Sequence, residues 1–110
     1  MLRTIAPYYA VAGQLQPDDM SEIARAGYKA VINNRPDGED PAQPSAAVME
    51  AAARAAGLQY RYIPVGAAYP VEKAAVALKA ALAELPRPIV GYCRSGARST
   101  TVYQLANDQD

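Results

Sequence analysis

The sequence contains no histidine, no phenylalanine and no tryptophan, and it has a single cysteine, Cys93. The lack of histidine excludes a Cys-His pair, a Ser-His-Asp triad and a histidine-based metal site. With only one cysteine we also expect no zinc site and no cofactor, and an internal disulfide is impossible. Any activation of Cys93 must therefore come from backbone dipoles and arginines.

The formal net charge is zero, because 11 basic residues balance 11 acidic ones. We therefore expect neither a nucleic acid nor a membrane surface as a partner. No apolar run approaches a membrane span or a signal peptide. A lone cysteine fits a reducing compartment, so we expect a cytoplasmic protein. The length of 110 residues predicts one domain, at 1–110.

Strand-like and helix-like segments alternate along the chain. Strands are predicted at 8–12, 28–33, 58–65 and 88–92, and helices at 17–27, 45–57, 71–85 and 99–106. This alternation indicates an α/β fold with a parallel central sheet flanked by helices on both faces. In such sheets ligands bind at the carboxyl ends of the strands. Cys93 and the polar loop from Asn34 both follow a carboxyl end, so we expect them at one rim.

The segment at 89–100, IVGYCRSGARST, carries the clearest functional signal. Its small residues after Cys93 allow the backbone to curl and to point its N–H groups inward, which makes an anion-binding nest. Arg98 adds a planar fork of donors for the oxygens of a phosphate or a sulfonate. The predicted anion-binding loop consists of Arg94, Ser95, Gly96, Ala97 and Ser99.

Cys93 is predicted to be a nucleophile, and Arg98 is predicted to stabilise the covalent intermediate that forms on the Cys93 sulfur. A free thiol has a pKa of about 8.5, and a helix N-terminus beside an arginine lowers this to about 3.5–7.5. Ser99 can also donate a hydrogen bond to the thiolate. The alternative, a cysteine buried for packing alone, does not explain the two flanking arginines.

The hexapeptide at 93–98, CRSGAR, resembles the active-site loop of rhodanese-like sulfurtransferases. With one residue fewer, it also resembles the Cys-x5-Arg loop of protein tyrosine and dual-specificity phosphatases. The segments at 9–15, 32–39 and 62–65 are similar to a bacterial family of beta-lactamase-hydrolase-like, phosphatase-like domains, also described as rhodanese-like sulfur transferases. The resemblance implies a protein-tyrosine/dual-specificity-phosphatase-like fold that carries a loop of rhodanese length.

Three departures from the phosphatase pattern favour sulfur chemistry. Only four residues separate Cys93 from Arg98, and this smaller ring suits one sulfur atom better than the three oxygens of a phosphate. Tyr92 stands where phosphatases usually have histidine. The segment at 66–70, where the resemblance places a general acid, has no carboxylate.

Arg35 and Asp37 are the remaining polar candidates, in the loop after the second predicted strand. Arg35 could hold an anionic substrate, and Asp37 could act as an acid or orient Arg98. The alternative is a Pro-Asp-Gly turn whose acids face water.

Our main prediction is a sulfurtransferase that passes sulfane sulfur through a Cys93 persulfide. Its partners would be a small anionic donor (thiosulfate or a persulfide), a thiol acceptor and a sulfur-oxidising enzyme. The first alternative is a phosphatase that forms a phosphocysteine at Cys93. The second is a sulfane-sulfur carrier or sensor.

Overall fold

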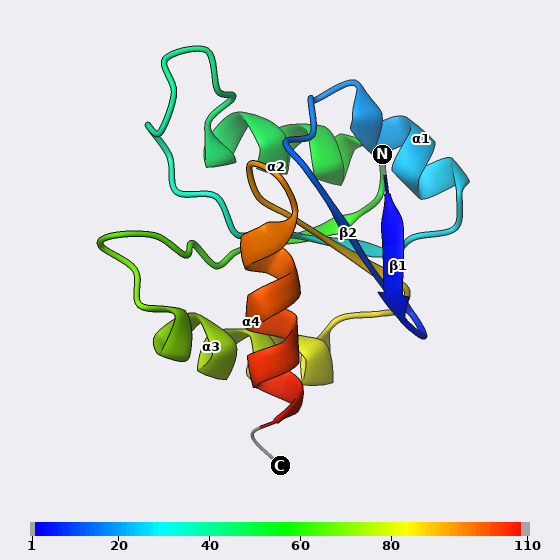
Figure 1. Cartoon of the computed structure of the whole chain (residues 1–110). Coiled ribbons are helices and arrows are strands. Elements are labelled where there is room, and N and C mark those ends of the chain that lie inside the picture. The colour runs from blue at the N-terminus through cyan, green and yellow to red at the C-terminus, as the bar shows by residue number, and fades with distance from the viewer. Residues whose placement is uncertain (1, 109–110) are drawn as a thin grey trace.

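A five-stranded sheet with helices on both faces makes up the computed structural model, which describes residues 2–108 (Figure 1). The elements in chain order are β1 (Arg3–Ala6), β2 (Tyr9–Ala12), α1 (Asp19–Arg25), β3 (Ala30–Asn33), α2 (Ala46–Ala55), β4 (Gln59–Tyr62), α3 (Val71–Glu84), β5 (Ile89–Tyr92) and α4 (Ala97–Asn107). The strand order is β1-β2-β5-β3-β4. Strands β2, β5, β3 and β4 are parallel to one another, and β1 pairs antiparallel with β2.

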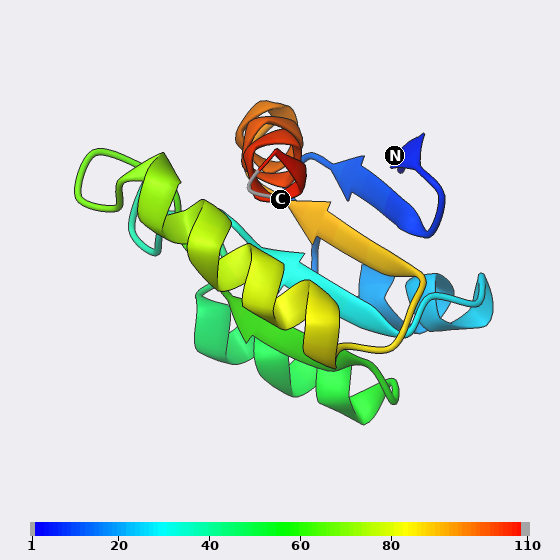
Figure 2. The ribbon, with the colours of Figure 1, turned by 90° about the horizontal axis from the view of Figure 1, so that it is seen from below.

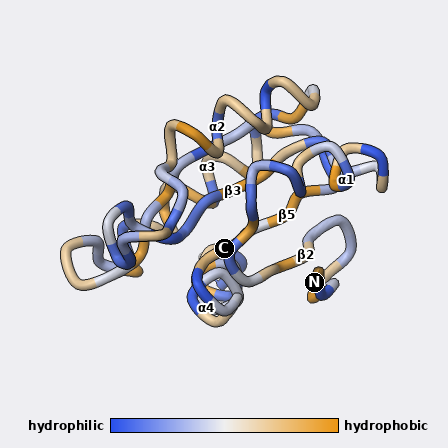
Figure 3. The backbone as a smooth tube through the Cα atoms, turned by 90° about the horizontal axis from the view of Figure 1, so that it is seen from above, coloured by the Kyte–Doolittle hydropathy of each residue, from blue (hydrophilic) through white to orange (hydrophobic). Residues whose placement is uncertain are grey.

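The two faces of the sheet carry separate hydrophobic clusters. One cluster packs α3 and α4 against the sheet, and the other packs α1 and α2 against the opposite face. In Figure 2, α2 and α3 run along the sheet and α4 is seen end-on. Strands β3 and β5 lie in the middle and are buried at every position, as expected for parallel strands covered on both sides. The hydropathy tube in Figure 3 is accordingly orange along much of β5.

The predicted α/β fold with a parallel central sheet is confirmed. Each predicted strand and helix is present, and Ser45 caps α2 by accepting a hydrogen bond from Val48 N. Several bounds were wrong: the strands expected at 28–33 and 58–65 are each four residues long, and α4 begins at Ala97 rather than at 99.

Strand β1 was not predicted, and it makes the sheet mixed rather than wholly parallel. Its sequence, RTIA, has no long apolar run, and its residues are exposed or half-buried. The strand exists because the chain reverses at Tyr8, which has φ of 69°, and then pairs with β2. A pairing that depends on a tight turn and an edge position leaves little trace in hydrophobic pattern.

No helix among residues 2–108 is both long and apolar enough to cross a membrane.

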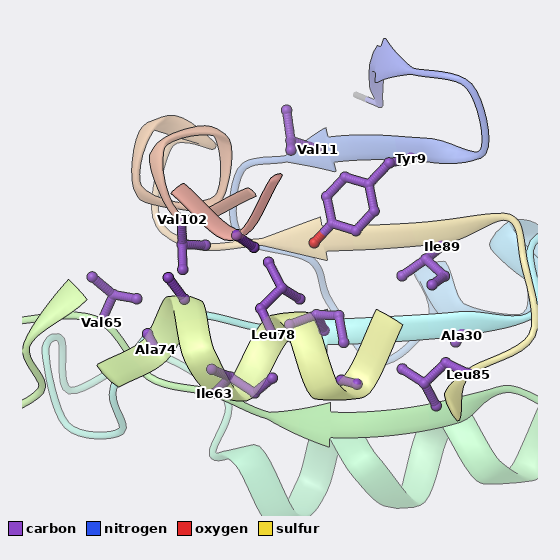
Figure 4. Close-up of a cluster of buried hydrophobic side chains, with 14 residues drawn as sticks. Tyr9, Val11, Ala30, Ile63, Val65, Ala74, Leu78, Leu85, Ile89 and Val102 are labelled. Carbon is purple, nitrogen blue, oxygen red and sulfur yellow. The ribbon is translucent and has the colours of Figure 1, made fainter. Parts of the chain in front are cut away.

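Tyr9 occupies the cluster between the sheet and α3 and α4 (Figure 4). Its ring stacks on Tyr103, with 4.2 Å between the ring centroids. Its buried hydroxyl has no hydrogen-bond partner in the described chain and lies over Gly91 of β5. A Cβ at position 91 would lie only 2.5 Å from that hydroxyl oxygen, so the central strand needs glycine there.

We expect Tyr9→Phe to leave the free energy of unfolding unchanged or to raise it by about 1 kcal/mol, because it removes a buried hydroxyl without a partner. Gly91→Ala should destabilise the protein, and less so when Tyr9→Phe is also present, because the clash loses its closest atom. Urea unfolding of the four proteins measures this coupling. Equal costs of Gly91→Ala in both backgrounds would contradict the packing described here.

Candidate active site

The turn from β5 into α4 places Cys93 at the base of a backbone loop. Cys93 follows the last residue of β5, and Gly96 adopts a left-handed conformation with φ of 95° just before α4 begins. This conformation favours glycine, and it turns Gly96 N toward Cys93 Sγ at 3.1 Å. The sulfur therefore accepts a hydrogen bond from an amide at the positive end of a helix.

The end of strand β2 supports this loop from the side. Cys93 N donates to Ala12 O at 3.3 Å, and Gln14 N donates to Arg94 O at 3.1 Å. Gly13 lies so close that a Cβ there would be 3.0 Å from Arg94 O. The loop is thus shaped by its neighbouring strand as well as by its own small residues.

Hydrogen bonds favour the thiolate form of Cys93 although the residue is fully buried. Burial by itself raises the pKa of the thiol. Hydrogen bonds from the backbone amides of Ser99, Ser95 and Gly96, together with the Ser99 hydroxyl, outweigh burial and lower the pKa below its ordinary value. A lower pKa raises the fraction of the thiolate, which is the reactive form of cysteine.

Arg98 reaches across to the loop that follows β3. Its Nη1 donates to Glu39 Oε2 and to Val65 O, each at 2.7 Å, and its Nη2 donates to Glu39 Oε1 at 2.9 Å. The carboxylate raises the pKa of Arg98, and the nearby Cys93 acts in the same direction. A guanidinium has five N–H donors, so the Nε–H and one Nη2–H remain for an anion above the sulfur.

Glu39 is the carboxylate that orients Arg98, a role that the sequence analysis considered for Asp37. Its hydrogen bonds from Arg98 and Arg35 lower its pKa to about 2, against the opposing effect of burial. Glu39 is therefore ionised at neutral pH and has no proton to donate.

Arg35 and Asp37 both serve the shape of the loop at 34–44. The Arg35 side chain is almost fully buried and donates to Glu39 Oε1 and to Gln14 Oε1, each at 2.9 Å. Asp37 is exposed, and its Oδ1 accepts a hydrogen bond from Ala46 N at the start of α2. In this structure Arg35 positions Glu39, and Asp37 Oδ1 is bonded at the start of α2.

Asn34 joins the two loops beneath the site. It is fully buried, its Nδ2 donates to Ile63 O, and its Oδ1 accepts from Ser99 Oγ, each at 2.8 Å. The expected meeting of the two loops at one rim is therefore observed. Asn34 and Glu39 were not singled out from the sequence, although their place after a strand end was a signal for both.

The remaining predicted loop residues differ in their exposure. Arg94, Ser95 and Ala97 are exposed, and Ser99 is fully buried. No cluster of three or more metal-ligating side chains exists among the described residues. The arrangement provides a stabilised thiolate, inward amides and an arginine, which together suit attack on the central atom of a small oxyanion.

Comparison with known proteins agrees with this geometry. The family model described as "Beta-lactamase hydrolase-like protein, phosphatase-like domain" matches residues 1–109. A beta-lactamase hydrolase-like protein of Xylella fastidiosa is 39% identical over 97 residues, which are 88% of this chain and 22% of the relative. The chain thus spans about a fifth of the length of that relative.

Solved structures show the same fold. A candidate phosphatase from Neisseria meningitidis Z2491 is 26% identical, with a TM-score of 0.82 over 92% of this chain and 72% of that protein. Tk-PTP in its active form is 18% identical, with a TM-score of 0.63 over 86% of this chain and 63% of that protein. The fold is that of the protein tyrosine and dual-specificity phosphatases, as predicted.

We expect Glu39→Gln to lower the free energy of unfolding by about 1 kcal/mol at pH 7, because it removes a charged bridge between two arginines that solvent partly screens. The pKa of Glu39 falls from 4.5 to about 2 on folding, so its contribution is complete above pH 4.5 and is lost as the pH falls toward 2. The stability gap between the two proteins should therefore close over this range in urea unfolding.

Glu50→Gln is the matched control, because Glu50 pairs with Arg54 on the open surface of α2. Its effect should be small at every pH. A gap for Glu39→Gln that does not change with pH would show that the ion pairs do not stabilise the fold.

Proposed function

The chain belongs to the family of beta-lactamase hydrolase-like protein, phosphatase-like domains, and from this premise we propose that it is a cysteine-dependent phosphatase. The observation that carries the proposal is the Cys93 sulfur beneath the loop amides, with Arg98 beside it. The sequence pattern favoured sulfur transfer first and a phosphatase second. The family and the solved relatives support the phosphatase better.

The proposed reaction has two steps. The Cys93 thiolate attacks phosphorus, an S–P bond forms, and the leaving oxygen departs with the electron pair of the broken P–O bond. The loop amides and Arg98 stabilise the negative charge on the equatorial oxygens. Water then attacks the phosphocysteine, which releases inorganic phosphate and restores the thiolate.

Among the described residues, this site has no evident general acid to protonate the leaving group. Glu39 is ionised, the Asp37 carboxylate is bonded to Ala46 N, and the segment at 66–70 has no carboxylate. We therefore propose substrates whose leaving group departs readily as an anion, such as aryl phosphates, acyl phosphates and phosphoanhydrides.

The test is turnover of a series of aryl phosphates whose phenols differ in acidity. We expect kcat/KM, which reports the step that expels the phenol, to fall steeply as the pKa of the phenol rises, and Cys93→Ser to lower it about a thousandfold or more. Asp37→Asn should leave the dependence on the phenol unchanged. A flat dependence, or one that becomes steep only in Asp37→Asn, would show that an acid protonates the leaving group.

Sulfur transfer is the second candidate, and the short loop with its missing acid favours it. The Cys93 thiolate would attack the outer sulfur of thiosulfate, and sulfite would leave with the electron pair of the broken S–S bond. A thiol acceptor would then take the outer sulfur and restore the thiolate. Sulfite needs no proton to leave, so a site without an acid suffices.

Intact-mass analysis after exposure to thiosulfate separates the candidates. If sulfur transfer operates, the wild type should gain one sulfur atom and Cys93→Ser none, and cyanide should remove it catalytically as thiocyanate. Loading without turnover would indicate a carrier or sensor. A protein that turns over aryl phosphates and gains no sulfur would exclude this second candidate.

A further inference from the structure

We propose that Asn34 is a positioning residue that competes with the Cys93 thiolate for the single hydroxyl proton of Ser99, and thereby sets the reactivity of the thiolate. The inference rests on the proposed role of Cys93 as nucleophile. It holds equally for attack on phosphorus and on sulfur, because it concerns the thiolate before the reaction.

The position of Asn34 and the orientation of its side-chain amide are both fixed. Its backbone N donates to Tyr92 O at 2.7 Å, and its side-chain Nδ2 donates to Ile63 O at 2.8 Å. A flipped amide would set two oxygens, Asn34 Oδ1 and Ile63 O, against each other in a fully buried place. The Oδ1 atom therefore faces Ser99 as an acceptor.

Ser99 lies between two acceptors and has one proton for them. Its Oγ is 2.8 Å from Asn34 Oδ1. The same hydroxyl acts on Cys93, where it lowers the pKa of the thiol. A serine hydroxyl donates one hydrogen bond at a time. When the proton is directed to Asn34, the thiolate keeps only the amide hydrogen bonds and the nearby charge of Arg98.

Competition for this proton changes the reactivity of the thiolate before the attack and costs nothing after it. A thiolate with fewer donors is more basic and more nucleophilic, since nucleophilicity of sulfur rises with its pKa. Once the sulfur is bonded to phosphorus or sulfur, it is no longer an anion and needs no donor. The proton can then stay on Asn34 Oδ1, so no buried acceptor is left unpaired.

The other groups that face Cys93 come from two elements. Arg98 of α4 supplies a positive charge, which Glu39 of the loop at 34–44 partly compensates. The amides of Ser95, Gly96 and Ser99 supply the remaining donors. A variant at position 34 leaves all of these residues in place, so a change in the thiol can be assigned to the Ser99 proton.

The experiment is the pH dependence of Cys93 alkylation by iodoacetamide. With one cysteine in the chain, the rate reports on this thiol alone. We expect Asn34→Ala to lower the pKa of the thiol by about one unit. The alkylation rate of the fully ionised thiolate should also fall, roughly threefold. Ser99→Ala should raise the pKa, and Asn34→Ala should have no further effect in the Ser99→Ala background.

Two further variants keep the test decisive. Asn34→Asp supplies a stronger acceptor and should raise the pKa, more in the wild-type background than with Ser99→Ala, and it decides the matter if Asn34→Ala does not fold. Thr101→Ala removes an exposed hydroxyl of α4, which donates to Ala97 O, and should leave the pKa unchanged.

Shifts at position 34 that are equal with and without the Ser99 hydroxyl would overturn the proposal, as would no shift at all. Alkylation requires no turnover, so the result does not depend on whether aryl phosphates are substrates.

Discussion

The left-handed turn at Gly96 is the constraint on which the site depends. It ends β5 and starts α4 within a few residues, and so brings an amide of the helix N-terminus within 3.1 Å of the Cys93 sulfur. An L residue with a side chain rarely adopts this conformation. Without the turn, the buried thiol would lose the Gly96 donor that helps to offset its desolvation, and its pKa would be higher.

The rest of the site is organised by the loop that follows β3. Glu39 from this loop binds Arg98, Asn34 binds Ser99, and Arg35 ties Glu39 to Gln14. All of these polar groups serve geometry and charge, and no carboxylate among them is free to donate a proton. This division is the basis on which we propose substrates with good leaving groups.

The central parts of this account could be predicted from the sequence because they are local. The cysteine, glycine and arginine of the loop, the alternating strands and helices and the parallel sheet all follow from short patterns. The identity of the carboxylate that binds Arg98 did not, since Glu39 and Asp37 lie in the same polar loop. Which of them reaches Arg98, 59 positions after Glu39, depends on the folded path of that loop. Asp37 instead accepts a hydrogen bond from Ala46 N. Strand β1 escaped prediction for the same reason, because a turn and a neighbour define it.

The most direct test of the central claim is an experimental structure with inorganic phosphate or tungstate bound. We expect the oxyanion to sit over Cys93 Sγ, with its oxygens accepting hydrogen bonds from the loop amides and from Arg98 Nε and Nη2, while Glu39 remains bonded to Arg98. An oxyanion bound away from Cys93, or one that displaces Glu39 while the loop amides stay unused, would contradict the account.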